Sequence, residues 1–215
     1  MVRSDRSSST EQALAAIVLC GGRSQRMGQD KAWVRVGDRT LLQHVVDRVR
    51  PVGQTIVVSA AGQHLPELPA DIRVVADECP EAGPLAGLLS GLNALSLLHG
   101  SEPDGPGQPD AVWVTGCDTP LIDERLIRGV ASQLGAADVA LVQHESHWNP
   151  LLAVYRRRVQ ARLQTLLDHN ERSLFRCLQH LNCRVIAADQ VARPGQLINV
   201  NTPEALQQLQ AILDE

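Results

Sequence analysis

The segment Leu14–Cys20 is a continuous apolar run that stops at two glycines, Gly21 and Gly22. A short uninterrupted run bounded by glycine is typical of a parallel strand that is buried on both faces of its sheet. It is far shorter than the roughly 20 residues needed to cross a bilayer, so it does not predict a membrane span. A strand of this kind requires a fold in which other elements cover both sides of the sheet.

Short apolar segments alternate with amphipathic segments along the rest of the chain. This pattern predicts strands at 14–20, 55–59, 72–76, 111–115, 137–143, 151–155 and 184–188, and helices at 40–52, 83–98, 123–134, 156–169, 172–181 and 203–213. Such alternation indicates an α/β sandwich with a mostly parallel sheet. The polar, Ser-rich residues 1–12 predict a flexible tail, and residues 13–215 a single domain.

Charge and cysteine content exclude several classes of protein. The net charge of −4 and the 2% aromatic content argue against binding to nucleic acid, which needs clustered cations and stacking rings. Five cysteines with no CxxC pair fit neither a disulfide framework nor a structural zinc site. We therefore expect a cytoplasmic protein with reduced thiols and no membrane association.

The loop that follows the first predicted strand carries glycines and then two cations, Arg26 and Lys31. Glycines let backbone N–H groups approach a ligand closely, and the cations suit phosphate oxygens, so the loop favours a polyphosphate. A glycine-rich turn with solvated arginines is the alternative. Lys31 is the one lysine beside nineteen arginines, which indicates a site that requires a compact ammonium group.

Polar residues at the predicted strand ends are the other candidates, because ligands bind beyond the carboxyl ends of parallel strands. Asp118 suits Mg²⁺ beside substrate phosphates, or it caps the next turn. Asp77 could accept hydrogen bonds from a ribose or a base, or it is an ordinary loop residue. Asn199 and Asn201 precede Thr202-Pro203, where an asparagine could also simply cap a helix.

Four motifs occur in the same order as in one known family. The string Leu-Cys-Gly-Gly-x-Ser-x-Arg-Met-Gly-x-Asp-Lys at 19–31 closely resembles the nucleotide-binding signature of the molybdenum cofactor guanylyltransferases (MobA type), which belong to the nucleoside-triphosphate transferase superfamily. The later matches are Asp77 with Gly83-Pro84-Leu85-Ala86-Gly87, Cys117-Asp118-Thr119-Pro120, and Asn199-Val200-Asn201-Thr202-Pro203.

The resemblance implies a Rossmann-like three-layer sandwich of the nucleotide-diphospho-sugar transferase type. It also implies Mg²⁺-dependent transfer of GMP from GTP to the terminal phosphate of molybdenum-carrying molybdopterin, with release of pyrophosphate. Further partners would be cofactor-assembly proteins and molybdoenzymes. The implied residues are Arg26, Lys31 and Asp118 for catalysis, Asp118 for the metal, Leu19, Cys20, Gly21, Gly22, Lys31, Asp77 and Asp118 for the nucleotide, and Asn199 and Asn201 for the pterin.

The chain departs from the family pattern at Ser59 and Asn149, where the family has an asparagine and a histidine. Three alternative functions stay open: a molybdopterin cytidylyltransferase that uses CTP, a transferase that acts on a sugar phosphate, and a non-catalytic carrier of the cofactor. We expect His144 and His147 to be solvated rather than to bind metal. The triplet Arg156–Arg158 is expected to form a solvated basic face or to meet an anionic ligand.

Overall fold

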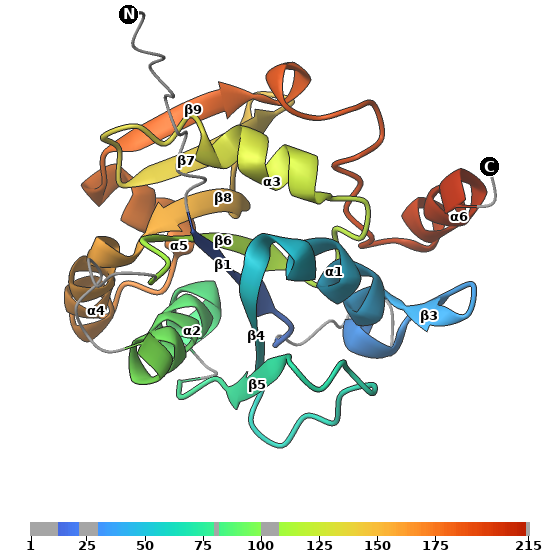
Figure 1. The fold of residues 1–215 in the computed structure, drawn as a ribbon, viewed down its shortest axis with the longest axis horizontal. Coiled ribbons are helices and arrows are strands. Elements are labelled where there is room, and N and C mark those ends of the chain that lie inside the picture. Colours follow the sequence, from blue (N-terminus) through green and yellow to red (C-terminus); the bar gives the residue numbers. More distant parts are fainter. Residues whose placement is uncertain (1–12, 22–29, 80–81, 100–107, 214–215) are drawn as a thin grey trace, which may run out of the picture.

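The computed structural model describes residues 13–21, 30–79, 82–99 and 108–213, and these build a seven-stranded sheet with helices on both faces (Figure 1). The predicted tail at 1–12 lies outside the described residues, as do Gly22 and Arg26. The strands of the sheet are β1 (Leu14–Leu19), β4 (Gly53–Ser59), β5 (Arg73–Ala76), β6 (Ala111–Gly116), β7 (Val139–His144), β8 (His147–Arg156) and β9 (Cys183–Ala187). The α-helices are α1 (Leu41–Val49), α2 (Gly83–His99), α3 (Glu124–Ala131), α4 (Gln160–Asp168), α5 (Leu174–Cys177) and α6 (Pro203–Leu213).

The sheet has the strand order β5-β4-β1-β6-β8-β7-β9. β1 pairs in parallel with both β4 and β6, while β8 runs antiparallel to β6 and β7. β9 returns to a parallel pairing with β7. The prediction of a mostly parallel sheet is confirmed, and the single reversed strand separates the β1 half of the sheet from the β7 half.

β1 lies at the centre and is buried on both faces, as its uninterrupted apolar sequence predicts. Ala16 and Val18 pack in the cluster that contains the apolar sides of α1 and α3. Ala15 and Ile17 face the opposite cluster, which contains α2, α4 and α5. Figure 1 shows these two sets of helices on the two sides of the sheet, so the predicted three-layer sandwich is confirmed.

Side-chain caps fix where two of the helices begin. The hydroxyl of Thr40 accepts a hydrogen bond from the backbone N–H of Gln43. The side-chain Oε1 of Gln43 accepts one from the backbone N–H of Thr40, which completes a capping box at the start of α1. The Asp123 carboxylate accepts from the Leu126 N–H, 2.8 Å away, and begins α3. These caps explain why α1 and α3 start within a residue of their predicted positions.

The structure corrects the sequence prediction around residues 145–181. Glu145 and Ser146 have φ angles of 48° and 67°, which make a tight hairpin turn, and β8 therefore starts at His147 rather than at residue 151. Arg156 belongs to β8, and a 3₁₀ turn at Arg157–Val159 precedes α4. The helix predicted at 172–181 is shorter in the structure, where this segment forms α5 and a 3₁₀ turn at Leu178–His180.

A small hairpin was not predicted, because its two strands are too short to show a hydrophobic period. β2 (Arg35–Val36) pairs with β3 (Arg39–Thr40) around Gly37, whose φ is 62°. Its residue Val36 packs with Val200 and with Leu209 of α6, so α6 lies beside the hairpin in Figure 1 and not in the helix layers. Over the described residues, no helix has both the length and the apolar character needed to cross a membrane.

Candidate active site

The carboxyl ends of β1, β4, β5 and β6 meet at one edge of the sheet, and hydrogen bonds continue beyond the strands there. The Cys20 N–H donates to the Val58 carbonyl over 2.8 Å, and the Cys117 N–H donates to the Leu19 carbonyl over 3.2 Å. The Asp77 N–H donates to the Ser59 carbonyl over 2.7 Å. The backbone of the predicted site is therefore held in place by the sheet itself.

Lys31, Asp118 and Asn201 come together at this edge. The Lys31 ammonium donates to Oδ2 of Asp118 over 2.8 Å and also to Oδ1 of Asn201. The side chains of Lys31 and Asp118 are 20% and 19% exposed, so their charges interact at a partly desolvated position. Three residues that the sequence assigned to different motifs thus form one contact group.

The position of Lys31 depends on Asp30, which caps the 3₁₀ helix Lys31–Trp33. Oδ1 of Asp30 accepts a hydrogen bond from the Ala32 N–H over 2.9 Å. Asp30 was part of the matched motif but was not assigned a role in the sequence analysis. The structure shows that it fixes the first turn of the segment that carries Lys31.

The carboxylate of Asp118 is fixed by its own backbone and by Gly116. The Asp118 carbonyl accepts a hydrogen bond from the Val200 N–H over 2.8 Å, which ties the segment 199–201 to the end of β6. A Cβ atom on Gly116 would lie 2.6 Å from Oδ1 of Asp118, so only glycine leaves room for the carboxylate in this position. Residues 117–118 therefore form a turn that presents Asp118 toward Lys31.

Asp77 lies at the end of β5, where its carboxylate contacts the start of the next loop and helix α2. Its Oδ1 accepts from the Cys79 N–H over 2.9 Å, and the Ser90 hydroxyl lies 3.5 Å away. Ser90 is a residue that the sequence analysis missed, since a serine inside a helix gives no signal. Ser59 is 5% exposed and donates to the Val75 carbonyl over 3.4 Å, so it bonds within the sheet.

Three residues implied for nucleotide binding differ in whether their backbone groups already form hydrogen bonds within the protein. These residues are Leu19, Cys20 and Gly21. The Leu19 carbonyl and the Cys20 N–H are used by neighbouring strands. Within the described part of the chain, no hydrogen bond engages the N–H or the carbonyl of Gly21. A Cβ on Gly21 would lie 3.1 Å from the Ala60 nitrogen, so the exposed glycine backbone lies close against the end of β4.

The thiol of Cys20 is buried beside that of Cys117. A hydrogen bond between the two side chains, followed by burial, raises the pKa of Cys20 above the ordinary value for a thiol. Cys20 is therefore protonated at neutral pH and unsuited to nucleophilic attack, since the thiolate is the reactive form.

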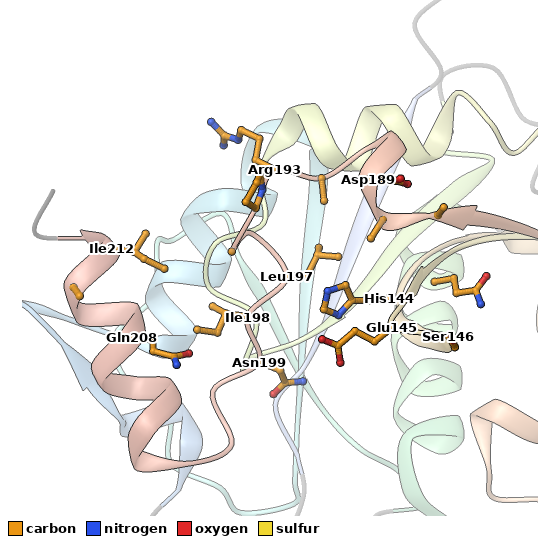
Figure 2. A pocket seen from close by; sticks show the side chains of 17 residues that line it. His144, Glu145, Ser146, Asp189, Arg193, Leu197, Ile198, Asn199, Gln208 and Ile212 are labelled. Carbon is orange, nitrogen blue, oxygen red and sulfur yellow. The ribbon is translucent and has the colours of Figure 1, made fainter.

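Asn199 and Asn201 link the Lys31 group to a large cavity. The Asn201 side chain accepts from Lys31 through Oδ1, so its Nδ2 faces Asn199 and donates to Oδ1 of that residue over 2.5 Å. Asn199 lines a cavity of about 1230 Å³ between the β7–β8 hairpin, residues 187–199 and α6. Figure 2 shows His144 and Glu145 of the hairpin on one side, Gln208 and Ile212 of α6 on the other, and Leu197, Ile198 and Asn199 between them.

The remaining predicted cations lie away from this site. Arg156 forms an ion pair with Asp110, and Arg158 pairs with Asp138 over 2.9 Å. Arg157 is 2% exposed and donates to Gln108 and to the Ser96 hydroxyl. The expectation of a solvated basic face or an anion site at 156–158 is wrong for Arg156 and Arg157, whose guanidinium groups are bonded within the fold. The side chain of Arg158 is 53% exposed, so its pair with Asp138 lies at the surface.

His144 and His147 are exposed at the two ends of the β7–β8 turn, as expected for solvated histidines. Over the residues that the structure describes, no group of three or more His, Cys, Asp or Glu side chains is arranged to hold a metal ion. A metal at Asp118 would therefore take most of its ligands from substrate phosphates and water, which is the common arrangement for Mg²⁺.

The sequence matches a known protein family and named relatives over most of its length. Residues 16–192 match the family described as "MobA-like NTP transferase domain". Over 210 residues the chain is 31% identical to a Bacillus cytotoxicus protein named "Probable molybdenum cofactor guanylyltransferase", covering 92% of this chain and 96% of that protein. Over 202 residues it is 30% identical to the "Molybdenum cofactor guanylyltransferase" of Pseudomonas fluorescens, covering 92% of this chain and 94% of the relative.

A solved structure shares the same fold. The Archaeoglobus fulgidus protein described as "Molybdopterin-guanine dinucleotide biosynthesis protein A" superposes with a TM-score of 0.71 at 20% sequence identity. The superposition covers 94% of this chain and 98% of the other. At this level of identity the similarity supports the arrangement of strands and helices described above.

Proposed function

Because this chain belongs to the MobA-like NTP transferase family, we propose that it transfers GMP from GTP to the terminal phosphate of molybdenum-carrying molybdopterin. The family and the nucleotidyltransferase class predicted from the sequence are confirmed by these comparisons. The observation that carries the proposal is the contact group of Lys31, Asp118 and Asn201, in which a cation and a carboxylate are held together at the carboxyl edge of the sheet.

The reaction needs little acid–base catalysis. The nucleophile is a phosphate oxygen that is already anionic; it forms a bond to the α-phosphorus of GTP while the bond to the β-phosphate bridging oxygen breaks and pyrophosphate leaves. The protein has to orient the two phosphates and to neutralise negative charge. A partly buried ammonium such as Lys31 is suited to the second task, and Arg26 is proposed to assist it.

The nucleotide is proposed to bind along the ends of β1, β4, β5 and β6. The backbone of Gly21 has an N–H and a carbonyl available for a base edge, which extends the predicted set of Leu19, Cys20, Gly21 and Gly22. Asp77 is proposed to accept a hydrogen bond from the nucleotide through Oδ2, since its bonds with the Cys79 N–H and the Ser90 hydroxyl involve Oδ1. Lys31 and Asp118 then face the phosphates.

Nucleotidyltransferases typically use a divalent metal ion, and the donor set here fits one. Oδ2 of Asp118 contacts Lys31, while Gly116 keeps the space beside Oδ1 clear of a side chain. A hard carboxylate oxygen next to substrate phosphates suits Mg²⁺, which we propose as the ion. When bound, it would neutralise phosphate charge, and Asp118 would hold it at the end of β6.

The acceptor is proposed to bind on the other side of the contact group, in the cavity beside Asn199. Since Oδ1 of Asn199 accepts from Asn201, its Nδ2 is the group left to donate to an acceptor phosphate. Part of the remaining wall is made of small and aliphatic side chains, which suits a planar ring. These side chains are those of Ala187, Ala188, Ala192, Leu197 and Ile198.

The rival functions are not favoured. The named relatives are guanylyltransferases, which speaks against a CTP-using or sugar-phosphate enzyme. The Lys31–Asp118 pair speaks against a carrier without catalysis, because such a carrier does not need a cation and a carboxylate at the phosphates. Contacts with other assembly proteins and molybdoenzymes, and the cytoplasmic location, stay predictions.

A nucleotide panel tests the proposal. The purified protein would be incubated with Mg²⁺, molybdenum-loaded molybdopterin and GTP, CTP, ATP or UTP, and both pyrophosphate and the dinucleotide product would be measured. We expect product with GTP and little with the other nucleotides, and no product from Asp118→Asn. Turnover with CTP that equals or exceeds that with GTP would refute the assignment, as would GTP binding without turnover.

A further inference from the structure

The side-chain amide of Gln63 joins three separate segments next to the active site. Its Oε1 accepts a hydrogen bond from the Ala60 N–H over 2.8 Å. Its Nε2 donates to the Cys20 carbonyl over 3.2 Å and to Oδ2 of Asp30 over 2.8 Å. All three bonds depend on one orientation of the amide, because a backbone N–H can only donate and therefore requires Oε1 to face Ala60.

The Asp30 carboxylate is shared between two partners, and each takes one oxygen. Oδ2 accepts from Gln63, while Oδ1 accepts from the Ala32 N–H at the start of the 3₁₀ helix that carries Lys31. A carboxylate held at both oxygens has a fixed orientation, so the bond from Gln63 also fixes the cap on that helix.

A second bond connects the same two segments. The indole N–H of Trp33, at the end of the 3₁₀ helix, donates to the His64 carbonyl over 2.8 Å. Trp33 is 47% exposed, and this bond gives its ring a defined position at the surface. The loop after β4 therefore holds both ends of the three-residue helix Lys31–Trp33.

We propose that Gln63 is a positioning residue for Lys31. Through Asp30 it orients the segment from which the Lys31 ammonium reaches Asp118 and Asn201, and it does so without touching the substrate. The inference rests on the proposed role of Lys31 in guanylyl transfer. It adds a residue from outside the four recognised motifs to the machinery of the nucleotide site.

Variants that exchange the hydrogen-bond donor and acceptor between residues 63 and 30 can separate this role from a general contribution to folding. Gln63→Glu places a carboxylate opposite the Asp30 carboxylate and the Cys20 carbonyl, so three acceptors meet with no donor. Asp30→Asn leaves two amides that cannot satisfy both Gln63 and the Ala32 N–H. In the double variant, the amide of residue 30 can donate to the carboxylate of residue 63, which restores the bond with its polarity reversed.

The experiment measures kcat, KM for GTP and KM for the pterin acceptor, together with GTP binding by calorimetry. We expect each single variant to lose about tenfold in kcat/KM for GTP, with little change in KM for the acceptor. We expect the double variant, Gln63→Glu with Asp30→Asn, to recover most of the kcat/KM that is lost when the bond between residues 63 and 30 is broken. Gln164→Glu is the matched control, because Gln164 makes the same amide-to-carboxylate bond to Asp168 on α4, away from the site.

Two results would overturn the inference: activity of Gln63→Glu equal to that of the wild type, or a double variant no more active than Gln63→Glu. The wild-type measurement separates this failure from that of the proposed function. If the unmodified protein does not transfer GMP, the proposed function is wrong. If the unmodified protein does transfer GMP and either of the two overturning results is found, only the role of Gln63 is refuted.

Discussion

The Lys31 ammonium lies 2.8 Å from Oδ2 of Asp118, although 87 residues separate the two in the sequence. The contact joins a residue that follows the glycine-rich loop to the second residue after β6. Because both side chains are about four-fifths buried, replacing either one leaves an unpaired charge in a partly desolvated place.

The first prediction concerns the lysine itself. Lys31→Ala removes the cation proposed to stabilise the phosphates, and we expect kcat to fall by about 100-fold or more. Lys31→Arg keeps the charge but replaces the compact ammonium with a planar guanidinium group, so it should retain only part of the wild-type activity. Initial rates of guanylyl transfer would measure both effects, with Arg162→Ala on the exposed side of α4 as the control. Near-normal turnover by either Lys31 variant would contradict the assignment.

A second prediction uses the glycine beside Asp118. In Gly116→Ala the new Cβ would lie 2.6 Å from Oδ1, so the carboxylate must move away from its present position. If Asp118 has the proposed catalytic role, a shift of this size lowers kcat by up to about 100-fold. Gly129→Ala in α3 is the matched control, since its Cβ would meet Val191 at an ordinary 3.7 Å. Equal activity of the two variants would show that the position of Asp118 is not critical.

A third prediction concerns thiol reactivity. Cys79 is exposed, whereas Cys20, Cys117 and Cys177 are buried, and burial raises the pKa of Cys177 to about 11. A group with a raised pKa stays protonated below that value, so Cys20, Cys177 and the half-buried Cys183, whose pKa values are all raised, contribute little thiolate at pH 8. Burial shields Cys117 from the reagent. Titration of the native protein with a chromogenic disulfide should show one fast thiol, which Cys79→Ser removes. A fast phase that survives this substitution would mean that the half-buried Cys183 or a buried cysteine is reactive, contrary to the prediction.

The fourth prediction is a pH effect on stability. Oε1 of Glu171 accepts hydrogen bonds from the N–H groups of Ser173 and Arg172, and these lower the pKa of Glu171 in the folded protein. The stabilisation is therefore complete above the unfolded-state pKa and is lost as the pH falls through the lower folded-state value. In urea unfolding at several pH values, Glu171→Gln should be less stable than the wild type at pH 7, with a difference that shrinks on acidification. A difference that is independent of pH would exclude this linkage.

The sequence was sufficient to locate the strands whose ends form the site. Asp77 and Asp118 follow β5 and β6, and the rule that ligands bind at the carboxyl ends of parallel strands selects them. Lys31 was selected as a cation of the glycine-rich loop that follows β1. The central strand was equally clear, because β1 is apolar at every position and is covered on both sides.

Other features could not be predicted, for identifiable physical reasons. The start of β8 carries His147, Trp148 and Pro150, which hide the strand pattern, and only the turn geometry at 145–146 reveals it. The role of Gln63 depends on the orientation of one amide in a loop, which leaves no periodic signal in the sequence. The inward bond of Ser59 likewise depends on a single rotamer.

The bond from Lys31 to Asn201 also has a consequence for the newly made chain. These residues are separated by 170 positions, so at typical rates of synthesis the ribosome adds the second about 10–30 s after the first. The Val200 N–H, which holds the carbonyl of Asp118, arrives equally late. The nascent chain can build the β1–β4–β6 core early, and on the proposed role of the contact group we expect it to become active only when the segment around Asn201 returns to that core. On the proposed function, we expect no consumption of GTP before the cavity proposed for the acceptor is complete.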